Sequence, residues 1–354
     1  MSSTLFNGSY IGRKNTGIGV VAKNLALSLS ADSVVLLDPI NIGRKGSIEI
    51  PSNLSPDNGF KGHLRRLYWM QKRVPSLMNK EGFELFLSPL PEAPLFSSVR
   101  SIVLAHDLIP LRYPQLNFSL AYFSLYVPSV LHHAEIVLCN SEATARELNS
   151  FFKVPVSKLA PIRLGINSKK LFPMNLPRED FFLILGRHNP HKNLSRVLKA
   201  FSILKSKDYQ MVFVGPFDQR YTPELKAIAN ELEISDKCIW IDWVNDDEKL
   251  SLLNKCKALL IPSLWEGFGL PALEAMACGS PVIASNRGAL PEVVAKFALM
   301  INPLNCESIA SAMKEICTNN NIHDRANIEG PMYASLFSWE NTANQVEDII
   351  KTLS

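Results

Sequence analysis

The chain has 354 residues, of which 47% are apolar and 20% are charged. This length is too great for one ordinary hydrophobic core, and it predicts two domains of about 150–180 residues each. No stretch reaches the roughly 18 uninterrupted apolar residues of a membrane-spanning helix, and the first residues lack the basic and apolar regions of a signal peptide.

The formal net charge of +4 is unevenly distributed. Residues 1–168 hold 17 Lys and Arg against 11 Asp and Glu, whereas residues 169–354 hold 20 against 22. This asymmetry is too weak to indicate nucleic acid, but it suggests that the first half meets something anionic.

The six cysteines stand singly in apolar contexts, without Cys-x-x-Cys or zinc spacing. They predict reduced, buried side chains in a cytoplasmic protein, and no metal site.

Short apolar runs alternate with helical patterns along the chain, which predicts βαβ units and parallel sheets. In the first half we expect strands over 4–9, 33–38, 83–88, 101–105, 134–140 and 158–162, with helices over 20–29 and 142–152. In the second half we expect strands over 182–186, 210–215, 238–241, 258–262, 281–284 and 298–301. The expected helices there span 194–204, 222–232, 246–255, 271–278 and 307–318.

A polar stretch with two prolines, residues 165–180, is typical of a linker between domains. We therefore expect an N-terminal domain over 1–167 and a C-terminal domain over 168–337, both Rossmann-like and facing each other across a cleft. A last helix over 338–354 is expected to pack back on the first domain. Ligands of open parallel sheets bind beyond the carboxyl ends of the strands, where the motifs described below are found.

The first motif along the chain is the loop that holds Gly17 and Gly19 between a strand and a helix. These glycines free backbone amides for a phosphate or a sugar, although a plain tight turn is the alternative. The loop lacks the Gly-x-Gly-x-x-Gly pattern, which disfavours a dinucleotide-binding dehydrogenase.

Residues 58–80 hold six Lys and Arg and no acidic residue. One helix face is expected to carry Arg65, Trp69, Lys72 and Arg73, with Leu64, Leu67 and Leu77 roughly opposite. A basic face with an interfacial Trp is typical of helices that lie on anionic membranes, so 61–73 is a candidate for peripheral membrane contact. A solvated basic face beside a core stripe is one alternative, and a surface for an acidic or lipid-diphosphate acceptor is another.

His106 and Asp107 follow an apolar strand. A histidine at a strand end can form a hydrogen bond with a substrate hydroxyl, and a purely structural histidine is the alternative. Asp107 is expected to cap or orient rather than react.

Arg187 and Lys192 lie five residues apart on a strand-to-helix loop that begins with Gly186. Arg offers a bidentate fork and Lys a point charge, so the two cations can straddle a diphosphate.

Residues 262–274 are the most informative segment. An apolar run leads into a loop with Glu266, Gly267 and Gly269, and Pro271 opens a helix whose first turn holds Glu274. The glycines allow close backbone approach, and the start of a helix attracts anions. Because ionised carboxylates only accept hydrogen bonds, they suit a ligand rich in hydroxyl groups.

The Glu-x7-Glu spacing around Gly-Phe-Gly-Leu-Pro resembles the signature of glycosyltransferase family 4, retaining enzymes of GT-B fold. The resemblance is strong over 181–304 and looser over 1–168. It implies an α/β fold of two Rossmann-like domains. It also implies a hexosyltransferase that uses a nucleotide-sugar donor, without a metal or other cofactor.

The resemblance also implies roles for individual residues. Arg187, Lys192 and the amides of Gly267, Phe268, Gly269 and Leu270 would hold the diphosphate. Glu266 would accept hydrogen bonds from hexose hydroxyls and Glu274 from the ribose. The backbone of Val244 would pair with the nucleobase, although Asp242 and Trp243 depart from the family pattern there. In the first domain, Gly17 and Gly19 would approach the donor diphosphate, and His106 would contact the transferred sugar or the incoming hydroxyl.

The expected reaction transfers a hexose, with retention, to a hydroxyl of a glycan or lipid-linked acceptor in polysaccharide or cell-envelope synthesis. A UDP-sugar is the favoured donor and GDP-mannose the next. A nucleotide-sugar epimerase of the same fold and a non-catalytic glycan-binding relative are the alternatives. The expected location is the cytoplasm, with peripheral contact on the inner face of the membrane as a further hypothesis.

Overall fold

The computed structural model describes residues 4–13, 17–114, 118–204 and 208–353. The chain forms two compact units. Unit 1 comprises Met1–Gly165 with Trp339–Ser354, and unit 2 comprises Ile166–Ser338. Among the described helices, none combines the length and the apolar character needed to cross a bilayer.

Unit 1 is built on a seven-stranded sheet in which the described strand pairs are parallel, with the order β3-β2-β1-β4-β5-β6-β7. Its strands are β1 (Thr4–Phe6), β2 (Val34–Asp38), β3 (Ser47–Glu49), β4 (Leu85–Ser88), β5 (Arg100–Ala105), β6 (Ile136–Cys139) and β7 (Leu159–Pro161). Its helices are α1 (Gly17–Ser28), α2 (Gly59–Glu81), α3 (Ile109–Arg112), α4 (Phe118–Ala121), α5 (Val127–His133), α6 (Glu142–Phe152) and α14 (Trp339–Leu353). The π-helical turn η3 (Tyr122–Tyr126) joins α4 to α5.

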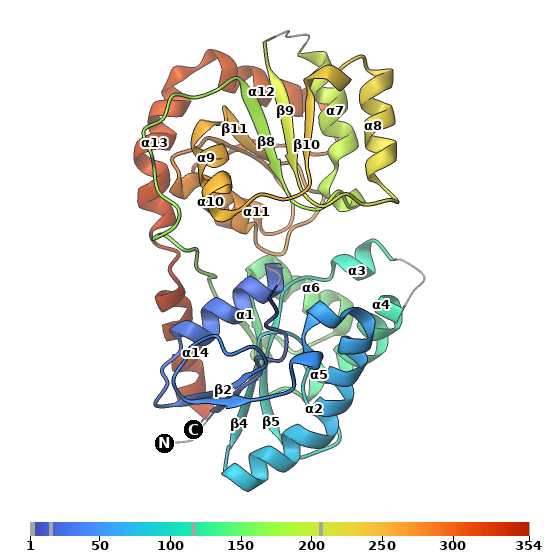
Figure 1. Cartoon of the computed structure of the whole chain (residues 1–354), viewed down its shortest axis with the longest axis vertical. Helices are drawn as coiled ribbons and strands as arrows, with labels where there is room; N and C mark the ends of the chain where they lie inside the picture. Colours follow the sequence, from blue (N-terminus) through green and yellow to red (C-terminus); the bar gives the residue numbers. More distant parts are fainter. Residues whose placement is uncertain (1–3, 14–16, 115–117, 205–207, 354) are drawn as a thin grey trace. The chain divides into compact units, whose positions relative to one another are not determined.

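The two faces of this sheet are covered by different helices. Buried side chains of α2, α5 and α6 form one core cluster with alternate residues of β1, β2, β4, β5 and β6. Helix α14 comes from the end of the chain and contacts α1, as Figure 1 shows in red and blue. It is held by the Thr342 hydroxyl, which donates to the carbonyl of Arg163 at 2.8 Å.

The described residues of unit 2 form a six-stranded parallel sheet with the order β10-β9-β8-β11-β12-β13. Its strands are β8 (Phe181–Leu185), β9 (Gln210–Val214), β10 (Cys238–Ile241), β11 (Ala258–Ile261), β12 (Val282–Ser285) and β13 (Leu299–Ile301). Its helices are α7 (Leu194–Ile203), α8 (Thr222–Glu231), α9 (Asp246–Lys255), α10 (Leu270–Ala277), α11 (Leu290–Val294), α12 (Cys306–Thr318) and α13 (Asn320–Ala334). The core cluster of one face joins β8, β9 and β11 with α7, α8 and α12, while α10 contacts β11 and β12 and is itself covered by α13.

Strand β3 and helix α13 are among the elements that were not expected from the sequence. Strand β3 has three residues at the edge of the sheet, and none of them is fully buried, so no apolar run marks it. Helix α13 contains Gly330 and Pro331 and has only two buried residues, which hides its periodicity. Gly330 is needed there because a Cβ atom would lie 2.9 Å from the carbonyl oxygen of Met276 on α10.

The expected orientation of α2 is wrong in part. Its buried row runs at four-residue steps along the helix, through Gly62, Arg66, Met70, Val74 and Met78. Leu64 is therefore exposed, on the same side as Arg65, while Trp69 packs partly against the core. The orientation predicted from the sequence was wrong because the buried row of α2 contains an arginine.

Arg66 is buried because Glu92 neutralises it. Its Nε donates to Glu92 Oε2 at 2.6 Å and one terminal nitrogen donates to Glu92 Oε1 at 2.8 Å, while another donates to the carbonyl of Leu54. The Tyr122 hydroxyl also donates to Glu92 at 3.3 Å. A buried charge costs several kcal/mol unless it is paired in this way, so the pair fixes α2 to the loop after β4.

We predict that Glu92→Ala lowers the free energy of unfolding by about 3–5 kcal/mol, because Arg66 is left buried without a counter-charge. Glu135→Ala is the matched control, since Glu135 pairs with Arg100 at the surface and its loss costs under about 1 kcal/mol. Urea denaturation measures both. Similar midpoints for the two variants would contradict the structural role of the buried pair.

Candidate active site

The candidate site is formed by loops at the carboxyl edge of the sheet in unit 2. The basic loop follows β8 and the glycine-rich loop follows β11, and these two strands are neighbours. The Asn193 side chain joins the loops, because its amide donates to the carbonyls of Pro262 at 3.1 Å and Pro303 at 2.6 Å. The backbone of Leu264 adds a hydrogen bond to the carbonyl of His191 at 2.7 Å. Two segments that lie some seventy residues apart are thus held side by side.

Lys192 and Glu266 form an ion pair where these loops meet. Lys192 Nζ lies 2.6 Å from Glu266 Oε1, and the Ser263 hydroxyl donates to the same oxygen at 2.5 Å. The side chains are 23% and 12% exposed, so the pair is partly shielded from water but still accessible. Burial raises the pKa of Glu266, but the charge and hydrogen bond of Lys192 outweigh it and the pKa lies below its ordinary value. Glu266 is therefore a carboxylate at neutral pH and can accept hydrogen bonds from hydroxyl groups.

The other cation of the basic loop has a different environment. Arg187 is exposed, and within the described part of the chain it forms no ion pair. The neighbouring His191 adds no charge, because burial and the nearby Lys192 lower its pKa to about 4. The positive charge available to a ligand at this loop thus comes from Arg187 and Lys192.

The glycine-rich loop is largely buried, and of residues 267–270 only Leu270 is half-exposed. Phe268 is buried, and its ring contacts that of Phe337 with centroids 6.3 Å apart. Gly269 has a left-handed φ of 104° and precedes Leu270, where α10 begins. Gly267 stands between Glu266 and Phe268. The expected contact of residues 267–270 with a diphosphate through their amides stays a prediction.

Gly288, which was not singled out from the sequence, lies directly against Glu266. Its φ is +63°, and a Cβ atom there would lie 2.6 Å from the backbone oxygen of Glu266 and 2.9 Å from its nitrogen. The amide of Ala289 donates to the same oxygen at 3.0 Å. The turn after β12 therefore fixes the backbone that carries Glu266.

Glu274 projects from α10 and pairs with a residue that the sequence did not indicate. Its Oε1 lies 2.6 Å from Lys249 Nζ on α9, and both side chains are mostly buried. Lys249 was missed because it follows three acidic residues and looks like part of a solvated helix face. Helix α9, which carries Lys249, begins directly after the half-buried Val244. A capping box between Asn245 and Glu248 fixes this start of the helix.

In unit 1, Gly17 and Gly19 lie in the first turn of α1, with Gly17 exposed and Gly19 buried. The preceding Asn15 and Thr16 lie outside the described residues. A Cβ atom at Gly17 would meet nothing within 4 Å, so this position is open.

His106 follows β5, as expected. Its Nε2 lies 2.8 Å from the carbonyl oxygen of Pro89 and therefore carries the hydrogen of that bond. Burial lowers its pKa to about 4, so at neutral pH the ring is uncharged and Nδ1 is an acceptor. Asp107 accepts a hydrogen bond from the amide of Ile109 at 2.9 Å, a local turn contact, while the N-cap position of α3 is Leu108.

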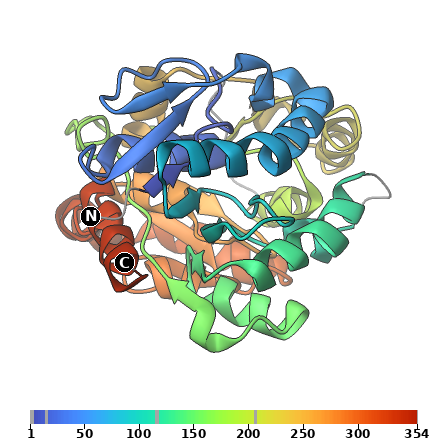
Figure 2. The same cartoon turned by 90° about the horizontal axis from the view of Figure 1, so that it is seen from below.

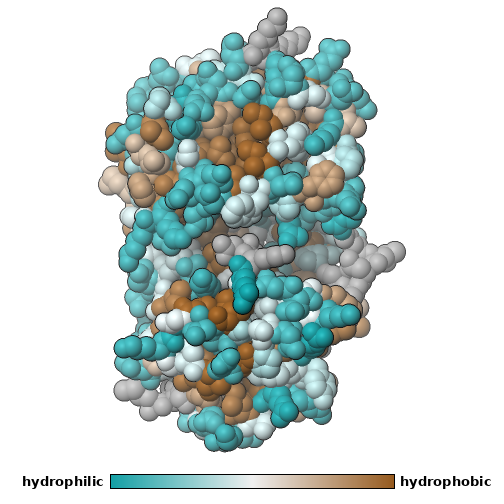
Figure 3. Space-filling view, in the orientation of Figure 1, coloured by the Kyte–Doolittle hydropathy of each residue, from teal (hydrophilic) through white to brown (hydrophobic). Residues whose placement is uncertain are grey.

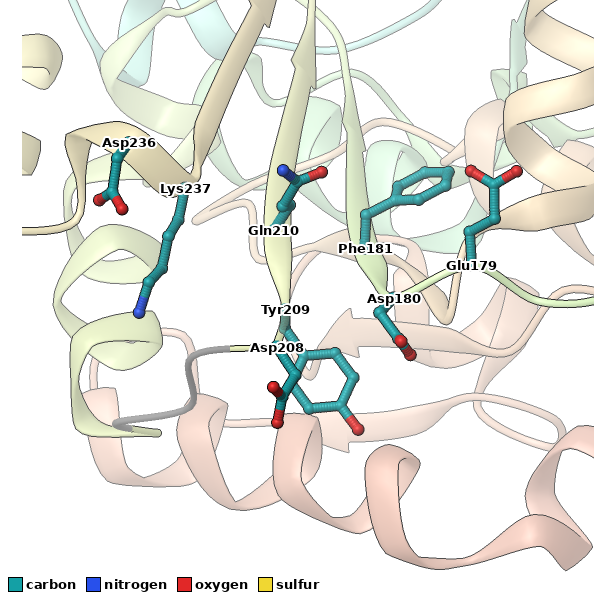
Figure 4. A pocket seen from close by; sticks show the side chains of 8 residues that line it. All are labelled: Glu179, Asp180, Phe181, Asp208, Tyr209, Gln210, Asp236 and Lys237. Carbon is teal, nitrogen blue, oxygen red and sulfur yellow. The ribbon is translucent and has the colours of Figure 1, made fainter.

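Two pockets in unit 2 involve none of these predicted residues. One, of about 330 Å³, lies where β8, β9 and β10 begin, and Figure 4 shows its acidic lining. Lys255 and Lys257 partly neutralise that lining through Glu179 and Asp180. The other, of about 480 Å³, lies beside α8 and is lined by His188, Gly215, Phe217, Thr222, Lys226, Trp240, Ile241 and Asp242. No group of three or more potential metal ligands occurs among the described residues.

The parallel sheets of the two units and the cations, carboxylates and glycine turns at one sheet edge define a glycosyltransferase of GT-B fold. The family described as Glycosyl transferases group 1 matches residues 169–331, and the description Glycosyltransferase Family 4 matches residues 15–170. The chain belongs to glycosyltransferase family 4 and is a glycosyltransferase.

Named relatives and a solved structure agree with this assignment. The O-antigen chain mannosyltransferase RfbU of Salmonella typhimurium is 30% identical over 250 residues, 70% of this chain and 69% of that protein. The serotype-specific mannosyltransferase WbdA of Escherichia coli is 26% identical over 268 residues, which are 70% of this chain but 33% of WbdA. HepE (Alr3699) of Anabaena, solved in complex with UDP-glucose, matches 99% of this chain and 100% of its own with a TM-score of 0.79 and 15% identity.

We predict that Gly288→Ala lowers turnover by about 10²-fold, because the added Cβ displaces the backbone of Glu266. Gly43→Ala is the matched control, since Gly43 has a φ of +79° and nothing within 4 Å of an added Cβ. Both variants suffer the left-handed strain of about 1–2 kcal/mol. Steady-state kinetics with urea denaturation separates the effects, and equal turnover in the two variants would show that Gly288 does not position Glu266.

Proposed function

We propose that the chain is a retaining mannosyltransferase, which moves mannose from GDP-mannose to a hydroxyl of a glycan acceptor. The observation that carries this proposal is the Lys192–Glu266 pair beside the start of α10. With Arg187 on the same loop, the pair offers two cations for a diphosphate and a carboxylate for sugar hydroxyls. The mannosyltransferase names of the relatives RfbU and WbdA favour mannose as the sugar.

This choice of donor reverses the preference drawn from the sequence, in which a UDP-sugar came first. The UDP-sugar remains the second candidate, and it is supported by the UDP-glucose in the complex of HepE. At 15% identity, the likeness to HepE supports only the fold. RfbU is 30% identical, and its name therefore carries more weight for the choice of sugar.

In the proposed donor complex, Arg187 and Lys192 neutralise the diphosphate together with amides at the start of α10. Bond cleavage leaves negative charge on the departing nucleoside diphosphate, so both cations stabilise the transition state more than the bound donor. Glu266 accepts hydrogen bonds from hexose hydroxyls and so orients the sugar. Glu274 accepts from the ribose, with Lys249 holding its carboxylate in place, and the backbone of Val244 pairs with the base.

Retention follows, in the proposed mechanism, from attack on the face that the leaving group vacates. The leaving phosphate oxygen takes the proton of the acceptor hydroxyl, so no side chain is needed as the base. The uncharged His106 contacts the transferred sugar or the incoming hydroxyl through Nδ1, since Nε2 is engaged by Pro89. The residues present supply the charge stabilisation that a metal ion gives other transferases.

The proposed biological role is glycan synthesis, and the acceptor is proposed to be a lipid-linked glycan. The name of RfbU, an O-antigen chain mannosyltransferase, supports this role. A nucleotide-sugar epimerase of the same fold is the competing function, and it would convert the donor without any acceptor.

We predict that GDP-mannose stabilises the chain against heat by mass action, by about 2.7 kcal/mol at a hundredfold excess over its dissociation constant. UDP-glucose is expected to give a much smaller effect at the same concentration. NMR of the product made from GDP-mannose should show the anomeric configuration of the donor. Stabilisation by UDP-sugars alone would contradict GDP-mannose as the donor. Conversion of the nucleotide sugar in the absence of an acceptor would favour the epimerase.

We predict that Lys192→Ala lowers turnover by about 10²-fold, the usual loss for one charge-stabilising group. The same variant removes the positive charge that lowers the pKa of Glu266. Because the carboxyl stays buried, its pKa should rise. The acidic limb of the pH–activity profile should therefore move to higher pH. Lys199→Ala, which removes an exposed lysine of α7, is the control and should leave rate and profile unchanged. Turnover near wild type in Lys192→Ala would exclude the assigned role.

A further inference from the structure

The exposed side of α2 has a composition unlike that of an ordinary solvated helix. Lys61, Arg65, Lys72 and Arg73 are all exposed there. Between them stand Leu64 and Tyr68, which are 42% and 70% exposed, and Phe60 is exposed in the first turn. Helix α2 runs along the outside of unit 1, with this side turned away from the core (Figures 1 and 2).

Two further apolar side chains border the same helix. Gln71 of α2 donates to the carbonyl of Ala93 at 3.0 Å and accepts from the amide of Leu95 at 2.8 Å. It also lies 3.3 Å from the hydroxyl of Tyr126. These bonds bring Phe96 and Leu125, the chain neighbours of Leu95 and Tyr126, close to α2, and they are 87% and 71% exposed. We call the following residues the α2 surface: Phe60, Lys61, Leu64, Arg65, Tyr68, Lys72, Arg73, Phe96 and Leu125.

The charge of the α2 surface is not compensated locally. Residues 58–80 contain no acidic side chain, and Arg66, the one buried cation, is already neutralised by Glu92. Within the described residues, Lys61, Arg65, Lys72 and Arg73 form no ion pair. Figure 3 shows one face of the molecule, on which hydrophobic residues gather in several patches among hydrophilic ones. On α2 itself, the exposed Phe60, Leu64 and Tyr68 stand among four exposed cations.

We propose that the α2 surface docks on an anionic lipid bilayer, with α2 parallel to the membrane plane. Each cation near such a membrane strengthens binding about fivefold, and exposed aromatic and aliphatic side chains enter the headgroup region. Four like charges disfavour a second copy of the chain as the occupant. The inference does not depend on the identity of the donor, and it places the enzyme where a lipid-linked acceptor is found.

Flotation with synthetic vesicles tests this proposal, because such vesicles contain no glycan acceptor. Wild-type chain should float with phosphatidylcholine vesicles that contain about one-third phosphatidylglycerol, and much less with phosphatidylcholine alone. Arg65→Gln with Lys72→Gln should weaken the partition roughly thirtyfold. Lys199→Gln with Lys314→Gln in unit 2 removes the same charge from other exposed positions and should float as wild type. Arg65→Lys with Lys72→Arg keeps the charge and should also float.

The outcomes separate this inference from the proposed function. Stabilisation by GDP-mannose should be equal in all four proteins, since these residues are remote from the Lys192–Glu266 pair in the chain and belong to the other unit. The membrane proposal would be contradicted if Arg65→Gln with Lys72→Gln floated as well as wild type, or if wild type floated equally with neutral and anionic vesicles. Neither result would affect the donor proposal. Failure of all proteins to float with anionic vesicles would overturn it as well and would favour an acidic protein or soluble acceptor as the occupant.

Discussion

The ion pair between Lys192 and Glu266 is the interaction on which the candidate site depends. It joins the loop after β8 to the loop after β11, Ser263 donates to its carboxylate, and the turn at Gly288 packs against the backbone of Glu266. Without the cation, burial would raise the pKa of the Glu266 carboxyl. The pair therefore keeps Glu266 ionised, the state in which it can accept hydrogen bonds from sugar hydroxyls.

The chain contains another buried ion pair, and the contrast between the two is informative. The Arg66 guanidinium forms hydrogen bonds with Glu92 and with the carbonyl of Leu54, and one of its nitrogens lies next to His63. Its donors are therefore engaged within unit 1. Lys192 has a single described partner and retains access to solvent. Saturated pairing suits a structural role, whereas an accessible ammonium with one described partner beside the start of a helix suits a ligand.

The sequence predicted much of the fold because βαβ patterns are repeated along the chain. Helices α6 and α9 and strand β10 have the predicted bounds, and most other predicted elements differ by one or two residues at their ends. The failures have physical causes. Strand β3 is stabilised by pairing with β2 rather than by its own apolar residues, and the core row of α2 includes an arginine whose partner lies 26 residues away. An ion pair between residues so far apart in the chain gives no local sequence pattern from which it could be predicted.

The site could be predicted as a set of loops, but not as a set of contacts. Parallel strands place Arg187, Lys192, Glu266 and the glycine turn at one edge of the sheet, and that much follows from the sequence. The contacts of Glu266 with Lys192 and Gly288, and of Glu274 with Lys249, depend on how the loops and helices pack in three dimensions. The roles assigned to these residues remain predictions.

A crystal structure of the chain with GDP-mannose tests the central claim most directly. We expect Arg187 and Lys192 at hydrogen-bond distance from the diphosphate, and Glu266 accepting hydrogen bonds from the hydroxyls of the mannose. A diphosphate bound elsewhere, with Glu266 making no contact to the sugar, would contradict the claim that this ion pair forms the donor site.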